Sequence, residues 1–222
     1  MRWNHRQVFV AALLAAATMF TSSGCLVNVM ALPYFLFAGE PTVKPPVKLL
    51  QKRRDEKKVL VLGFADPSLK FGFDAVDDEL TGLIIGEIME KEKRLEVIPE
   101  RKVRGWRDTN PHWTDKSLQE IGENFDVDYV IFFEVSTLSL NETKNQYLLQ
   151  GKTKVIVKIH DVNKDAQIFN DTYQREYPPE RAVPLTDFSS EEQFRRLFLR
   201  TIAREISWYV VPHRHADEIS DI

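Results

Sequence analysis

The sequence predicts a two-layer α/β domain, α+β-like in arrangement, with a mixed sheet of about five strands. Three observations predict this fold class. Residues 58–66 form a short apolar run typical of a buried strand, and residues 73–88 repeat apolar side chains every three or four positions, as a helix does. Residues 147–161 alternate apolar and polar side chains, as in a half-exposed antiparallel strand. The expected order is β-α-β-α-α-β-β-β-α, with the helices packed mainly on one side of the sheet.

The first three elements are indicated by their apolar pattern and by the residues that begin or end them. The opening strand stops after Gly63, at Asp66 and Pro67. A helix is expected to begin near Asp74, which can cap it, and to bury one stripe consisting of Phe73, Val76, Leu80, Leu83, Ile84 and Ile88. The stretch RLEVIPE is a short strand that ends at Pro99, and this proline is well placed at the first position of a short helix.

The second half of the domain begins with another helix, which Thr114 or Asp115 can cap, and whose apolar residues are Leu118, Ile121 and Phe125. Residues 128–140 then read as a central strand, because the early part is apolar on both faces. With the two strands that follow, at 147–161 and 168–177, this strand forms a carboxy-terminal antiparallel meander.

A final helix is predicted from Ser189 to the stop at Pro212. Ser189 and Glu192 match a capping box, and the apolar stripe consists of Phe194, Leu197, Phe198, Ile202, Ile206 and Tyr209. We therefore expect a single α/β domain at 58–211, followed by a flexible tail at 212–222.

The amino-terminal segment has the pattern of a secretory signal peptide. Arg2, His5 and Arg6 precede an apolar run at 8–20, and the small residues TSSG follow it. The apolar run is shorter than the roughly 20 residues that a membrane-spanning helix needs. Residues 1–24 are therefore predicted to be a signal peptide, with cleavage between Gly24 and Cys25.

Cys25 is the only cysteine of the chain, so no intrachain disulfide can form. The stretch Ser22 to Cys25 resembles the bacterial lipobox, which implies that Cys25 is lipidated and anchors the chain to the membrane. Residues 25–57 are then the lipid anchor and a Pro/Lys-rich tether. An uncleaved membrane anchor is the alternative, because residues 7–39 carry no charge and an apolar stretch follows the cysteine.

Composition and motifs indicate a binding function. With 30 Lys and Arg against 33 Asp and Glu there is no basic excess, which argues against a nucleic-acid partner. No nucleophile with activating neighbours is recognisable, so we expect no catalytic residues, no metal and no cofactor. The least ordinary stretch is the loop at 105–115. Its candidates for partner contact are Trp106, Pro111, His112 and Trp113, which alternatively pack over a small core.

The succession KVLVLGFAD, LEVIPERKV, ENFDVDYVIFFEVSTLS and VIVKIHDVNKDAQIF resembles a domain shared by several envelope proteins. These are the amino-terminal regions of TolB, curli-secretion-type lipoproteins and the lipoprotein activators of penicillin-binding proteins. The resemblance covers residues 58–177. It implies an envelope-associated, non-catalytic domain that docks other proteins or assembles into an oligomer.

Together these features favour a bacterial envelope lipoprotein whose domain faces the periplasm and binds an unknown envelope protein. Membrane attachment is expected through lipidated Cys25, and a homo-oligomer is possible. Two alternatives remain open: a membrane-tethered hydrolase with an unrecognised site, and an oligomeric structural component of an envelope complex.

Overall fold

The computed structural model describes residues 42–52, 54–142 and 145–219, which belong to one compact unit that begins at Thr42. The predicted signal peptide at 1–24, its cleavage site and the lipidation site at Cys25 lie outside the described residues.

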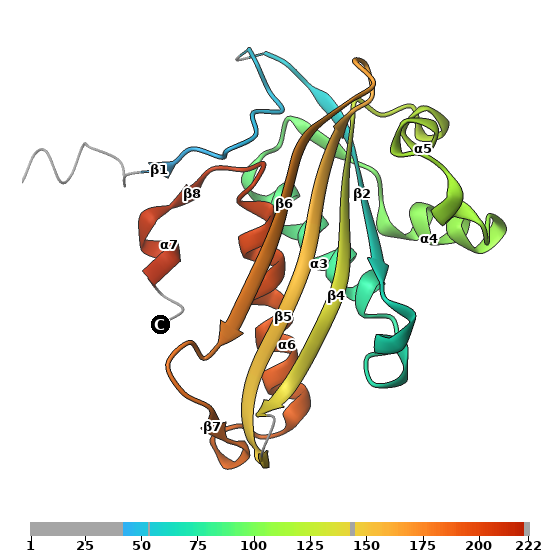
Figure 1. Ribbon diagram of the computed structural model, residues 1–222. Coiled ribbons are helices and arrows are strands. Elements are labelled where there is room, and N and C mark those ends of the chain that lie inside the picture. The colour runs from blue at the N-terminus through green and yellow to red at the C-terminus, as the bar shows by residue number, and fades with distance from the viewer. Residues whose placement is uncertain (1–41, 53, 143–144, 220–222) are drawn as a thin grey trace, which may run out of the picture. The chain divides into compact units, whose positions relative to one another are not determined.

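A mixed sheet forms the centre of the fold, in the order β3-β2-β4-β5-β6 (Figure 1). β2 is parallel to β3 and β4, whereas β4, β5 and β6 form the predicted antiparallel meander. A sixth, two-residue strand, β7, pairs with the start of β5. The strands are β2 (Lys57–Ala65), β3 (Leu95–Val97), β4 (Tyr129–Glu142), β5 (Asn145–Asp161), β6 (Ala166–Tyr177) and β7 (Val183–Pro184).

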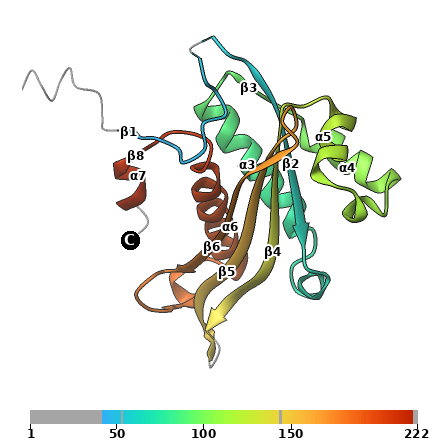
Figure 2. The same cartoon turned by 45° about the horizontal axis from the view of Figure 1, so that its top comes forward.

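Helices cover both faces of the sheet, unequally. The two long helices, α3 (Val76–Lys91) and α6 (Glu191–Ser207), lie on one face. The shorter α4 (Glu100–Thr109) and α5 (Leu118–Phe125) lie on the opposite face beside β2 (Figure 2). The predicted mixed α/β fold and element order are confirmed, with the two long helices on one face as expected and α4 and α5 forming a second helical layer. The second helical layer exists because β2 is apolar on both faces, so that each face needs a cover.

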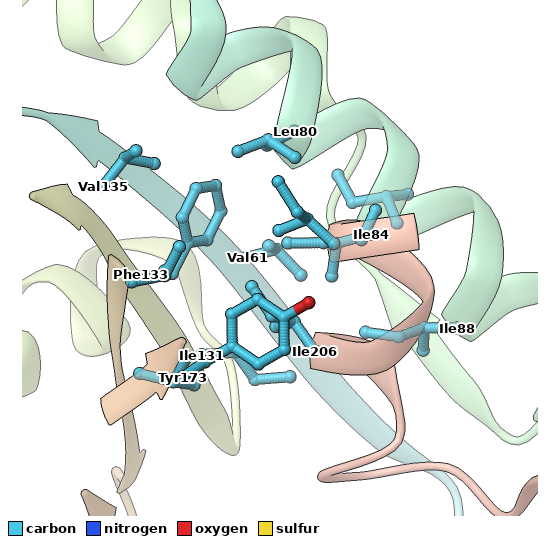
Figure 3. Packing of buried hydrophobic residues seen from close by; sticks show 14 of the residues in the cluster. Val61, Leu80, Ile84, Ile88, Ile131, Phe133, Val135, Tyr173 and Ile206 are labelled. Atoms are coloured by element: carbon cyan, nitrogen blue, oxygen red, sulfur yellow. The ribbon is translucent and has the colours of Figure 1, made fainter. Parts of the chain in front are cut away.

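The larger core lies between the sheet and the long helices. Val61, Ile131 and Phe133 project from the sheet towards Leu80 and Ile84 of α3 (Figure 3). Tyr173 extends this core to the last strand of the sheet, and its hydroxyl donates a hydrogen bond of 2.8 Å to Glu205 Oε2 at the end of α6. Burial and the neighbouring Glu205 carboxylate raise the pKa of Tyr173 far above its usual range.

The smaller core lies under α4 and α5. Leu60 and Leu62 of β2 meet Ile121 and Phe125 of α5 there. Gly122 allows α5 to lie close to the sheet, because a Cβ atom at this position would come within 2.4 Å of a methyl group of Val162. The two cores together explain why the first strand reads as an unbroken apolar run.

The compact unit extends beyond both predicted ends of the domain, 58 and 211. Within the segment predicted as a tether, Val47 and Leu49 are buried in the larger core, and Val47 N donates to Tyr209 O at 3.1 Å. Within the segment predicted as a tail, β8 (His213–Arg214) pairs with β1 (Thr42–Val43), and α7 (His215–Ile219) follows. Isolated apolar residues between prolines and lysines show no periodicity, so sequence patterns do not reveal their burial.

Three predicted helix caps are wrong by one to three residues. α3 starts after Ala75, which has a left-handed backbone with φ of 54°, and no side chain caps it, so Asp74 is not the cap. The cap of α5 is Ser117, because Thr114 and Asp115 belong to the short 3-10 helix η2 (Trp113–Asp115). The cap of α6 is Ser190, the residue after Ser189, and its side chain accepts from Gln193 N at 3.1 Å.

Candidate functional site

A cleft of about 450 Å³ opens beside α5, on the face of the sheet that α4 and α5 cover only in part. The sheet supplies one side of the cleft through Phe64, Phe132 and Lys158. The other side is the stretch from Trp113 to Ile121, which comprises η2 and the start of α5. The cleft therefore joins the loop that the sequence singles out to the polar face of the meander.

Strand register decides which side chains meet in this cleft. Leu62 of β2 pairs with Phe132 of β4, and Phe132 pairs with Lys158 of β5. Two residues further along β2 and β4, Phe64 pairs with Glu134, and Glu134 pairs with Ile156 of β5. Because alternate residues of a strand share a face, Phe132, Glu134, Lys154, Ile156 and Lys158 lie on the same side of the sheet. We call these five residues the open face.

The wall opposite the open face is held by aromatic packing. Trp113 is 8% exposed, and its ring meets Phe64 edge to face with centroids 6.0 Å apart. Trp106 packs in the same manner on Phe125 at 5.2 Å. Such pairs fix the loop on the smaller core, so the cleft has one rigid aromatic wall.

The four residues predicted to contact a partner fall into two groups. Trp106 and Trp113 pack against the smaller core, as the packing alternative describes, and of the four only Trp113 lines the cleft. Pro111 and His112 are exposed outside it, and the His112 side chain is 89% exposed. Contact with a partner stays a prediction for these residues.

An ion-pair network fastens the wall to the opposite helical layer. Arg107 Nη1 donates to Asp78 Oδ1 and Arg107 Nη2 donates to Asp77 Oδ2, each at 2.7 Å. The Asp77 side chain is only 5% exposed. Burial raises the pKa of Asp78 above its usual range, although the Arg107 charge opposes this rise. The guanidinium also lies 5.2 Å from the Trp113 ring centroid, which links α3 to the cleft.

Two lysines and one glutamate are the charged side chains that line the cleft, and Lys154 of the open face lies outside this lining. Lys158 Nζ lies 5.8 Å from the Phe132 ring centroid, and Lys116 and Lys154 are exposed. Within the described ranges, no carboxylate lies within 4 Å of the amino group of these three lysines. Glu134 is the acidic group among the lining residues. An incoming carboxylate would therefore meet lysines that have no competing ion pair.

The other polar groups of the cleft are engaged in structural contacts. Ser117 Oγ accepts from Glu120 N and donates to Glu120 Oε2, each at 3.1 Å, which forms the capping box of α5. His160 Nε2 lies 2.9 Å from Gln119 Oε1. Among the residues that the structure describes, no hydrogen bond joins this serine to the histidine, and no group of three or more His, Cys, Asp or Glu is placed to hold a metal ion.

Sequence reasoning missed Phe64, Phe132 and Glu134. It treated the lysines of the meander as a solvated face and the aromatic loop as a separate feature, whereas the structure brings the two together. The available signal was strand alternation, which places Phe132 and Glu134 on the face of the lysines once the strands are aligned.

No protein-family model and no curated protein matches the sequence. Similar solved structures include lipoprotein GNA1162 from Neisseria meningitidis, with 10% identity and a TM-score of 0.46 over 67% of this chain and 97% of that chain. The PelC dodecamer from Paraburkholderia phytofirmans has 9% identity and a TM-score of 0.46 over 77% and 96% of the two chains.

TolB from Acinetobacter baumannii, a protein that the sequence resembles, is also among the similar structures. Its identity is 10% and its TM-score 0.33, over 75% of this chain and 28% of that chain. At these values the likeness does not define a function, which we infer from the cleft instead. In the described part of the chain, none of the helices combines the length and apolar character needed to cross a membrane.

Proposed function

We propose that this protein is a non-catalytic docking module that holds an acidic, aromatic-containing segment of a partner protein in the cleft. The observation that carries the proposal is that the cleft lies between the rigid wall formed by Trp113 and the open face of the sheet. Phe64, Phe132 and Trp113 offer apolar contact area, and the lysines supply charge at its border.

The chemistry of the cleft selects the class of partner segment. An aromatic or large aliphatic side chain fits between Trp113 and Phe132, because apolar walls with few polar groups favour such a group. Carboxylates on either side of it would be attracted to Lys116, Lys154 and Lys158. A basic segment would meet like charges instead and would be rejected.

The absence of turnover is part of the proposal. Its support is that Ser117 is engaged in the capping box and that His160 faces Gln119. The two residues therefore do not form a pair of nucleophile and general base. A general base must lie within hydrogen-bond reach of the group that it activates.

We further propose that the module belongs to the cell envelope, tethered through lipidated Cys25 and facing the periplasm. The proposal rests on the signal-like segment 1–24 and the lipobox-like residues before the cysteine. The intact mass of the protein extracted from membranes tests the anchor. A mass that retains Met1 would remove the lipoprotein assignment, whereas loss of residues 1–24 with added acyl chains supports it.

Site-specific photocrosslinking in cells tests the docking function. A photoreactive residue replaces Lys116 at the cleft or, as a control, Lys93 in the exposed turn after α3. Mass spectrometry then maps the captured peptide. We expect the Lys116 position alone to capture a segment with carboxylates beside an aromatic residue, and Lys158→Glu to reduce the yield about tenfold. The proposal would be contradicted if the photoreactive residue at position 93 captured the same segment with equal yield, or if Lys158→Glu left the yield at position 116 unchanged.

A further inference from the structure

β6 is an open edge of the sheet. In the strand order of the described residues no strand pairs with its outer side, and Figure 1 shows it running along one side of the sheet. β6 is 12 residues long, whereas the opposite edge, β3, has only three. Long exposed edges present unpaired peptide groups to other chains, and proteins usually cover or block them.

Hydrogen bonding inside the sheet identifies which residues of β6 face outward. Asp66 N donates to Val135 O at 3.1 Å, so the main chain of Val135 faces β2 and not β5. Val135 pairs with Val155, whose main chain therefore faces β6, at Tyr173. Tyr173 thus bonds inward, and its neighbours Thr172 and Gln174 direct their peptide groups away from the sheet.

The same alternation makes Asn170 and Glu176 outward-facing. One outward donor is occupied locally, because Thr172 N donates to Asp171 Oδ1 at 2.8 Å. This bond agrees with the assignment, since an inward-facing Thr172 would bond to β5. Among the described residues, no other backbone hydrogen bond reaches the outer edge of β6.

We propose that this edge pairs antiparallel with the same edge of a second copy of the chain, in the register in which Tyr173 opposes Tyr173. Charge complementarity selects the occupant and the register. In this alignment Asp171 of each copy lies directly opposite Arg175 of the other. The two residues form a non-hydrogen-bonded pair, the type in which side chains approach most closely.

Arg175 has donor capacity for this contact. Its Nη2 lies 3.3 Å from Glu205 Oε1, and the Arg175 side chain is 25% exposed, so the guanidinium can be reached from outside. A shift of the register by four residues in either direction would place Asp171 opposite Asp171, or Arg175 opposite Arg175, and like charges directly opposite each other are unfavourable. The favoured register repeats the ion pair twice, as a two-fold axis requires.

Pairing of two copies would join their sheets across the axis. The contact lies at residues 170–176 of β6, whereas the docking cleft is bounded by β2, β4, β5 and α5 and reaches β6 only at Gln167, so the inference goes beyond the proposed docking function. The two proposals can therefore fail separately. If docking fails, the edge contact is still expected, and if edge pairing fails, Lys158 and Trp113 are still in place to bind a partner segment.

Disulfide crosslinking of the full-length protein in membranes tests the register. Two differently tagged copies are co-expressed, one carrying Thr172→Cys and the other Gln174→Cys, both retaining Cys25. These two positions oppose each other as a hydrogen-bonded pair with Cα atoms about 5.5 Å apart, within the range a disulfide spans. We expect a mixed dimer after mild oxidation. Co-expression of Thr172→Cys with Asn170→Cys is the register control and should give less than a tenth of that yield.

A proline substitution tests the edge hydrogen bonds by a second route. Gln174→Pro removes an outward N–H and leaves the inward bonds to β5 intact, whereas Gln174→Val keeps the N–H. Circular dichroism verifies that both variants fold. The contact is reported by a second cysteine pair, Asn170→Cys and Glu176→Cys, which also oppose each other. With this pair, the proline variant should form at least 90% less mixed dimer. Stronger crosslinking in the control pair, or an unchanged dimer yield in folded Gln174→Pro, would overturn the proposal.

Discussion

The guanidinium of Arg107 lies over the indole of Trp113, 5.2 Å from the ring centroid. The same guanidinium binds Asp77 and Asp78 at the start of α3, so a single side chain connects the long-helix layer to the cleft wall. The shape of the cleft therefore depends on a contact between elements on opposite faces of the sheet.

Replacing Arg107 with Gln should destabilise the fold by about 3 kcal/mol, because the buried Asp77 carboxylate would lose its counter-charge. Urea unfolding followed by circular dichroism measures the change. Arg101→Gln, on the exposed side of the same helix, is the matched control and should stay within about 0.5 kcal/mol of wild type. Equal stability of the two variants would show that the network does not hold the wall.

The segment before β2 contributes to the core despite its linker-like composition. Leu49→Ala should cost about 3 kcal/mol, because Leu49 is 1% exposed and its removal leaves a cavity. The adjacent Lys48 is exposed, so Lys48→Ala should change the free energy of unfolding by less than about 0.5 kcal/mol. Thermal unfolding of the full chain compares the two variants, and a harmless Leu49→Ala would place the domain boundary back near residue 58.

Much of the fold could be predicted because local pattern and tertiary contacts agree in it. The apolar stripe of α3 and the alternation of β5 are readable without knowing their neighbours. The helix caps were harder, since Thr114, Asp115 and Ser117 are all good capping residues and only packing decides among them.

The candidate site was less predictable than the fold. It depends on pairing between β2 and β4, which brings Phe64 beside Glu134 although 70 positions separate them. No local pattern contains that register. The tryptophans were visible in the sequence, but whether each faces solvent or the smaller core follows from where α4 and α5 settle on the sheet.

The capping box next to the cleft should respond to acid. Hydrogen bonds from the Ser117 backbone N–H and hydroxyl hold the pKa of Glu120 below its ordinary value of 4.5. A carboxyl whose pKa is lower in the folded state contributes stability that is present above the unfolded pKa and is lost as the pH falls through the folded pKa. The protection of the α5 amides, after correction for the intrinsic exchange rate at each pH, should therefore decrease below pH 4.5.

Ser117→Ala tests the cause of this shift. The hydroxyl bond disappears while the backbone bond remains, so the pKa of Glu120 should move part of the way back towards its ordinary value. Ser117→Thr retains a hydroxyl and serves as the control. Carboxyl titration by nuclear magnetic resonance reports both, and an identical Glu120 pKa in wild type and Ser117→Ala would assign the shift to the backbone bond alone.

Replacing each of two helical glycines with alanine should change the free energy of unfolding in opposite directions. Gly122→Ala places a methyl group 2.4 Å from Val162 Cγ2 and 3.1 Å from Val130 Cγ2, which should cost about 2 kcal/mol through overpacking. Gly105 lies within α4, and an added methyl group there would meet no atom of another element within 4 Å, so Gly105→Ala should gain about 1 kcal/mol from helix propensity. Urea unfolding of both variants measures the difference. If both substitutions stabilised the protein, the close approach of α5 to the sheet, and with it the depth of the cleft, would be contradicted.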